Sequence, residues 1–352
     1  MSDYIIMGLL LCFLAYTLLF GMKKGNGEQF FDVNNSKALR GFFCIIIILV
    51  HTRVEYQNKI QDMIGSFAYI GVTFFFMTSS YGLSLKTTQS SDYLKHFWRR
   101  RLPKLLIPCF LINTVITVIY HYKFSVGITL KRLFNINIWV RWLLVCYFFF
   151  WLSCLLIKNI RISKTVTSVA VIIFSIVIYY LTTVGIVTET TWTTECYGFV
   201  WGIVLASVSE RFVKYIKEKW FLKWIICLVT ALITGVAYLK FKLVPLYGDY
   251  LLKVVLGVVL ITFILIFNVK YSLGNKVSLF LGSISFEIFL IQEDILYLLS
   301  EIMPQLSSGM MIIIGITAVV VSAFITHLIT LLFFRVATII KEALKKTTEN
   351  KV

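Results

Sequence analysis

Long stretches of uncharged, mostly apolar residues recur along the whole chain, for example at residues 4–22, 63–85, 165–188 and 302–326. Each reaches or approaches the ~20 residues with which an α-helix spans a hydrocarbon core about 30 Å thick. Barrel strands would alternate apolar and polar residues, and these stretches do not. The pattern therefore predicts an all-α, polytopic integral membrane protein.

Windows of ~20 residues divide the chain into about eleven expected membrane spans. They run approximately over residues 4–22, 38–55, 64–85, 104–122, 138–157, 165–187, 192–209, 222–240, 251–269, 279–299 and 310–334. No basic segment precedes the first span, so we expect a retained helix rather than a cleaved signal peptide. The loops are short, which predicts no soluble domain.

The basic residues predict an orientation. With the N-terminus outside, 25 of the 34 Lys and Arg residues fall on cytoplasmic segments, which favours an N-out/C-in arrangement. The net charge of +17 is also found in nucleic-acid-binding proteins. In a polytopic protein, however, such an excess reflects topology and contact with anionic headgroups, so we expect membrane lipids and no nucleic acid as partners.

Cysteine and histidine are distributed without metal-site spacing. The seven cysteines lie within or at the edges of apolar spans, where they are expected to be small buried hydrophobic residues. The four histidines are scattered along the chain. We therefore expect neither a metal centre nor a disulfide-built ectodomain.

The stretch "ALRGFFCIIIILVHT" places an ionisable residue at each end of one apolar helix, Arg40 and His51. At about 1.5 Å per residue, the two lie roughly 16 Å apart along the helix axis. Ionisable residues at such depths are costly and usually functional. Taken singly, Arg40 also fits an interfacial anchor and His51 an imidazole at the outer interface.

Five motifs, taken in order, resemble those of the acyltransferase-3 superfamily, membrane O-acyltransferases of cell-envelope sugars. They are "LRGFFCIIIILVHT" (39–52), with its Arg-x10-His spacing, "FFFMTSSYGLSL" (74–85), "YLKHFWRRRLPKLLIPCFL" (93–111), "WVRWLLVCYFFFWL" (139–152) and "LGSISFEIFLIQ" (281–292). The chain departs from the family pattern at five positions. Ser80 replaces Gly, Lys104 replaces Arg, and Phe286, Phe289 and Gln292 replace Tyr, Tyr and His.

The resemblance implies a ten-helix core over residues 37–335, an additional helix and loop over 1–36, and a basic cytoplasmic tail over 336–352. It also implies transfer of an acetyl or similar acyl group from cytoplasmic acyl-CoA to a hydroxyl of an extracytoplasmic or lipid-linked glycan. The expected location is the cytoplasmic membrane, which the chain crosses several times. The donor, such as acetyl-CoA, and the glycan acceptor are the expected ligands.

On this interpretation the basic residues bind the phosphates of acyl-CoA, because guanidinium groups form bidentate contacts with phosphate. The residues expected there are Arg40, Arg99, Arg100, Arg101 and Lys104. His51 is expected to be the general base, because a free imidazole has a pKa of about 6.5. Covalent transfer through His51 remains open at this point.

A second group is expected to bind the acceptor or to orient His51. It consists of Glu55, Ser79, Tyr81, Trp192, Glu287 and Gln292. Glu55 would share a helical face with His51 if the helix continued that far. Two other functions stay open: a transporter or flippase for a lipid or small polar solute, and a non-catalytic family member in envelope assembly.

Overall fold

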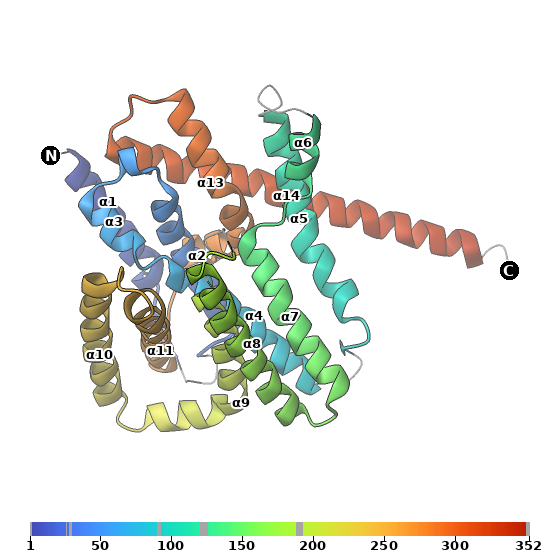
Figure 1. Cartoon of the computed structure of the whole chain (residues 1–352), viewed down its shortest axis with the longest axis horizontal. Coiled ribbons are helices and arrows are strands. Elements are labelled where there is room, and N and C mark those ends of the chain that lie inside the picture. The colour runs from blue at the N-terminus through green and yellow to red at the C-terminus, as the bar shows by residue number, and fades with distance from the viewer. Residues whose placement is uncertain are drawn as a thin grey trace.

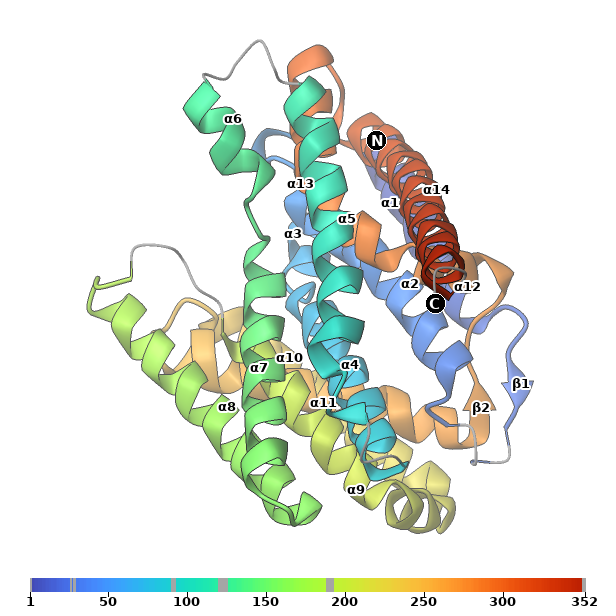
Figure 2. The same ribbon diagram turned by 90° about the vertical axis from the view of Figure 1, so that its right-hand side faces the viewer.

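The computed structural model describes residues 2–25, 27, 30–89, 93–119, 126–187 and 193–349, and it is a bundle of helices (Figures 1 and 2). The helices are α1 (Ser2–Leu19), α2 (Val33–His51), α3 (Lys59–Gly65), α4 (Tyr69–Gln89), α5 (Phe97–Ile119), α6 (Val126–Leu133), α7 (Ile138–Leu156), α8 (Ile160–Thr183), α9 (Tyr197–Lys217), α10 (Trp220–Phe241), α11 (Lys253–Lys270), α12 (Lys276–Ser283), α13 (Ser285–Ile302) and α14 (Ser308–Glu349). Single turns at Val54–Tyr56, Thr194–Cys196 and Tyr247–Leu252 precede α3, α9 and α11. The only described strands, β1 (Lys23–Lys24) and β2 (Tyr271–Ser272), pair antiparallel.

The structure confirms an all-α polytopic membrane protein. Nine helical segments of the described chain are long and apolar enough to cross a membrane, and α1 adds a shorter apolar helix. The expected span at 279–299 is instead divided between α12 and α13, because the backbone of Ile284 leaves the helical conformation. The number of crossings, the orientation and the domain boundaries stay predictions.

Helix α4 lies inside the bundle, where it packs along α9 and also contacts α2 and α11. Figure 2 shows α7 on the side of α4 opposite the strands and α5 in front of α4, and Figure 1 shows α14 extending beyond the other helices. Three apolar clusters fill the interior: one joins α2, α13 and α14, and the other two flank α4. The helix of Arg40 and His51 is therefore held from several sides.

Two pairs of glycines let helices touch backbone to backbone. A Cβ at Gly41 would overlap the Ser278 carbonyl oxygen, and one at Gly282 would overlap the Lys37 carbonyl oxygen, so α2 and α12 can approach only because both positions lack side chains. In the same way, Gly198 and Gly202 of α9 face the backbone of α4. Such small residues are favoured at helix contacts in membranes, where packing replaces the hydrophobic effect.

An ion pair is buried where α9 and α11 begin. Lys253 Nζ lies 2.6 Å from Glu195 Oε1, and the two side chains are 5% and 0% exposed. Thr194 Oγ1 donates to the other carboxylate oxygen of Glu195 at 3.0 Å, and Lys253 Nζ lies 4.9 Å from the centre of the Tyr69 ring. These contacts join α4, α9 and α11, and they account for two charges inside the bundle.

We predict that Gly41→Ala lowers the free energy of unfolding by about 1–3 kcal/mol, the usual cost of overpacking a filled interior. The added Cβ has no space because it meets backbone atoms of α12. Thermal unfolding in detergent measures this change. Gly235→Ala in α10 is the matched control, because a Cβ there meets no heavy atom within 4 Å. A Gly41→Ala protein as stable as the wild type would contradict the packing described.

Candidate functional site

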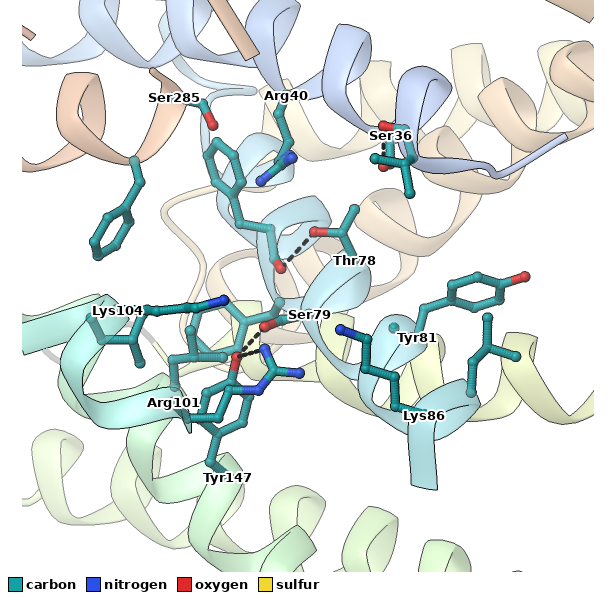
Figure 3. Close-up of a pocket in the computed structure, with 18 of the residues that line it drawn as sticks. Ser36, Arg40, Thr78, Ser79, Tyr81, Lys86, Arg101, Lys104, Tyr147 and Ser285 are labelled. Carbon is teal, nitrogen blue, oxygen red and sulfur yellow. Dashed lines mark hydrogen bonds between the residues drawn. The ribbon is translucent and has the colours of Figure 1, made fainter. Parts of the chain in front are cut away.

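A cavity of about 860 Å³ lies among α2, α4, α5, α7 and α13 (Figure 3). Its polar lining includes Ser36, Arg40, Thr78, Ser79, Tyr81, Lys86, Arg101, Lys104, Tyr147 and Ser285. Along α4 the lining extends from Val72 to Gln89, which corresponds to roughly 25 Å of helix at 1.5 Å per residue. The cavity therefore follows most of the length of α4.

The two ends of the cavity differ in chemistry. Four cations line it. Lys86 lies near the end of α4, Arg101 and Lys104 lie near the start of α5, and Arg40 lies in the first half of α2. The acidic residue in the lining is Asp32, which accepts a hydrogen bond of 2.7 Å from the Asn35 amide and caps α2. Toward the start of α4 the walls are apolar and aromatic, with Val72, Phe75, Phe76, Trp139, Val140, Phe286 and Phe289.

Arg40 has a buried nitrogen that makes no hydrogen bond to a described residue. Its Nε atom is buried and has no hydrogen-bond partner among the described residues. Arg40 shares one face of α2 with Val33 and Ser36, at the i, i+3, i+7 spacing of a helix, and all three line the cavity. A buried guanidinium nitrogen without a partner is costly, and an anion in the cavity would satisfy it.

Arg101, in contrast, is held by aromatic hydroxyls. Its Nε donates to the Tyr93 hydroxyl at 2.9 Å, and its Nη1 donates to the Tyr147 hydroxyl at 3.4 Å. The Tyr147 hydroxyl is in turn hydrogen-bonded to Ser79 Oγ, as the dashed lines of Figure 3 indicate. The guanidinium is therefore oriented in the cavity wall, and no carboxylate among the described residues forms an ion pair with it.

The structure divides the predicted basic cluster. Arg101 and Lys104 are three residues apart on one face of α5 and line the cavity together with Leu105. Arg99 and Arg100 lie on other faces of the same turn, outside the lining, and the Arg100 guanidinium stacks over the Tyr93 ring at 5.7 Å. Of the second predicted group, Ser79 and Tyr81 line the cavity.

His51 lies outside the cavity lining, at the last residue of α2. The apolar end of the cavity nevertheless lies near it: Gly71, next to Val72, packs against Ile47, which is about one turn before His51. The His51 imidazole has no hydrogen-bond partner among the described residues. Its ionic neighbour is Glu293, with which it interacts electrostatically. His51 and the basic end of the cavity therefore occupy different depths of the bundle.

Helix α13 packs along α2 between the level of Arg40 and the level of His51. The Cys44 thiol lies 3.6 Å from the Ser285 carbonyl oxygen at one end, and Arg53 Nη1 donates to Ser300 Oγ at 3.2 Å at the other. Phe286, Phe289 and Glu293 follow each other at i, i+3 and i+7 on one face of α13. Phe286 and Phe289 line the cavity, and Glu293 interacts electrostatically with the His51 imidazole.

Glu55 does not share a helical face with His51. Helix α2 ends at His51, and Thr52 has an extended backbone, so Glu55 falls in the separate turn Val54–Tyr56. There its carboxylate pairs with Arg53 Nη2 at 3.1 Å in an exposed position. A hydrogen bond from its own backbone amide and the neighbouring Arg53 charge lower the pKa of Glu55. Glu55 was expected to orient His51 only if α2 continued to Glu55, and α2 does not continue that far.

Three further predicted residues lie apart from the cavity lining or outside the described chain. Glu287 points to α14, where its Oε1 lies 2.8 Å from His327 Nδ1. Gln292 is buried in α13, and its Oε1 has no partner among the described residues. Trp192 lies outside the described residues.

Sequence reasoning did not identify Tyr147 or Lys86 as part of the site, although the motif that contains Tyr147 was noted. Both signals were weak, because a tyrosine within an aromatic run and a lysine at a helix end are common in membrane proteins. In the described part of the chain, no three His, Cys, Asp or Glu side chains are grouped so that they could hold a metal ion.

Comparison with known protein families identifies the family to which the chain belongs. A family model described as an acyltransferase domain matches residues 33–335. No curated protein and no solved structure matches the chain. The matched range contains α2 to the middle of α14, and with them every residue of the cavity wall that belongs to a helix. Since the model covers most of the chain, the protein is a membrane acyltransferase of the acyltransferase-3 family.

Proposed function

We propose that the protein is an O-acyltransferase that transfers an acetyl or similar acyl group from acyl-CoA to a hydroxyl of an extracytoplasmic or lipid-linked glycan. The observation that carries this proposal is the cavity. Its cations form no ion pair with a carboxylate of the described residues, its walls toward the start of α4 are apolar, and a buried Arg40 nitrogen has no partner in the described part of the chain. Acyl-CoA carries several phosphate charges at one end and an acyl thioester at the other. Its phosphates therefore match the cations of the cavity, and its thioester arm matches the apolar walls.

The donor is oriented by charge. Its phosphates contact Arg40, Arg101, Lys86 and Lys104, and Arg101 is already oriented by Tyr93 and Tyr147, so little side-chain entropy is lost on binding. The volume of about 860 Å³ is that of a small-molecule site. The pantetheine arm then extends along α4 between the aromatic residues, which brings the thioester toward the His51 end.

His51 acts as the general base in this proposal. It takes the proton of the acceptor hydroxyl while the hydroxyl oxygen attacks the thioester carbonyl, the C–S bond breaks, and the CoA thiolate leaves and is protonated. His51 lies one turn beyond Ile47, which packs against Gly71 beside the lining residue Val72, and this proximity supports the role. Entry of the acceptor from the side opposite to the basic residues keeps donor and acceptor on opposite faces of the membrane.

We predict that Arg40→Gln weakens acyl-CoA binding about 10- to 100-fold, because one charged contact to phosphate is lost. Isothermal titration of the purified protein with a non-hydrolysable acetyl-CoA analogue measures the affinity. Arg335→Gln on exposed α14 is the control with the same change in charge. Unchanged affinity in Arg40→Gln would contradict a donor site at this cavity.

We predict that His51→Gln reduces acyl transfer about 10²- to 10⁴-fold, the usual contribution of a general base, and changes donor affinity less than twofold. Membranes with matched protein levels are incubated with radiolabelled acetyl-CoA, and label is followed into alkali-labile ester on envelope glycan. Equal label in the variant and the wild type would exclude His51 from catalysis. Donor binding without label in the wild type would favour a non-catalytic role.

A further inference from the structure

A second cavity, of about 720 Å³, lies between α8 and α9, which contact each other. Its charged lining consists of Arg161 and Lys164 from the first turns of α8, and Glu210 and Arg211 from α9. It shares no lining residue with the donor cavity. Nothing in the proposed acyl transfer uses it.

This second cavity has an excess of positive charge. Three cations face one carboxylate, and no carboxylate of the described residues forms an ion pair with any of the three. Lys164 Nζ donates to Thr88 Oγ1 at 3.2 Å, which fixes the lysine at the end of α4. With three cations and one carboxylate, the lining attracts an anion that makes several contacts, such as a phosphate group.

Three of the four hydroxyl side chains that line the cavity have the same orientation. Thr165, Ser168 and Ser207 each donate to a carbonyl of their own helix, at 3.1, 3.0 and 3.0 Å. Their oxygens therefore remain available as acceptors and not as donors. A ligand that supplies hydroxyl donors beside its phosphate, as a glycerol headgroup does, is complementary to this arrangement.

The surroundings indicate that the ligand comes from the membrane. Helix α8 buries only 17% of its most apolar window inside the bundle, the second-lowest share among the candidate spans. Val169 and Ile173 of α8 and Val204 of α9 are 50%, 55% and 38% exposed, and they continue the two helices away from the basic end. A headgroup in the cavity would have its acyl chains along these residues, as expected for basic pockets between membrane helices.

We propose that the cavity between α8 and α9 binds the headgroup of an anionic glycerophospholipid of the phosphatidylglycerol type. The phosphodiester contacts Arg161, Lys164 and Arg211, and the glycerol hydroxyls donate to the Ser and Thr oxygens. The site adjoins the donor cavity through α4: Thr88 contacts Lys164, and Tyr81, which lines the donor cavity, interacts with Ser209, which lines this one.

Native mass spectrometry of the delipidated full chain tests the proposal, with phosphatidylglycerol and phosphatidylcholine titrated separately. We expect the wild type to bind phosphatidylglycerol about tenfold more tightly than phosphatidylcholine, and the Arg161→Gln/Arg211→Gln protein to lose this preference. Arg335→Gln/Lys341→Gln, on exposed α14, makes the same change in charge and should keep it. An equal loss in both double variants would overturn the proposal, because any surface charge would then suffice.

Two further arms separate the alternatives. Inorganic phosphate should not displace phosphatidylglycerol at equal concentration, and displacement would identify a site for a free anion and overturn the lipid assignment. Ser168→Ala/Ser207→Ala removes two acceptors without changing charge, so it should weaken phosphatidylglycerol but not phosphatidic acid, which lacks the glycerol hydroxyls. This variant also tests the proposal if the arginine variant does not fold, and equal weakening of both lipids would contradict the assigned orientation.

Discussion

The contact of α2 with α12 through Gly41 and Gly282 is the constraint on which the site depends. The two backbones touch where a side chain on either helix would overlap a carbonyl oxygen of the other. Because Gly41 follows Arg40 directly, this contact fixes the depth and rotation of the guanidinium in the bundle. It also fixes His51, since both residues belong to one uninterrupted helix. The position of Arg40 relative to His51 is thus set by helix packing and not by a loop.

Charge compensation distinguishes the site from the rest of the interior. Elsewhere in the described chain, buried charges meet partners: Lys253 pairs with Glu195, and Glu287 contacts His327. Within the cavity wall, the described residues offer Arg101 tyrosine hydroxyls and no carboxylate, and they leave a buried nitrogen of Arg40 without a partner. Unpaired cations inside a membrane protein are expensive, and they persist where a ligand supplies the anion.

Much of the fold followed from the hydrophobic pattern, because length and apolar composition alone identify membrane helices. The division of the expected span at 279–299 could not be predicted, because it depends on the backbone conformation of Ile284. The end of α2 at His51 could not be predicted either, and it means that Glu55 does not share a helical face with His51. For the site, the motifs indicated Arg40, Arg101, Lys104, Ser79 and Tyr81, all of which line one cavity. They could not separate Arg101 from Arg99 and Arg100, because which face of α5 meets the cavity is decided by the packing of α5 against α13 and α14 and by ring contacts of Phe97 and Trp98 with α7. Tyr147 and Lys86 come from other helices, and no local signal in the sequence joins them to Arg40.

The central claim is that the donor enters at the basic end of the cavity and the acyl group leaves at the opposite face, beside His51. Sealed vesicles of known orientation test this most directly, with radiolabelled acetyl-CoA added to one side and a glycan acceptor enclosed on the other. The account predicts label on the acceptor only when the donor is on the side of Arg40, Lys86 and Lys104. Equal labelling from either side, or labelling only when donor and acceptor share the side of His51, would contradict it.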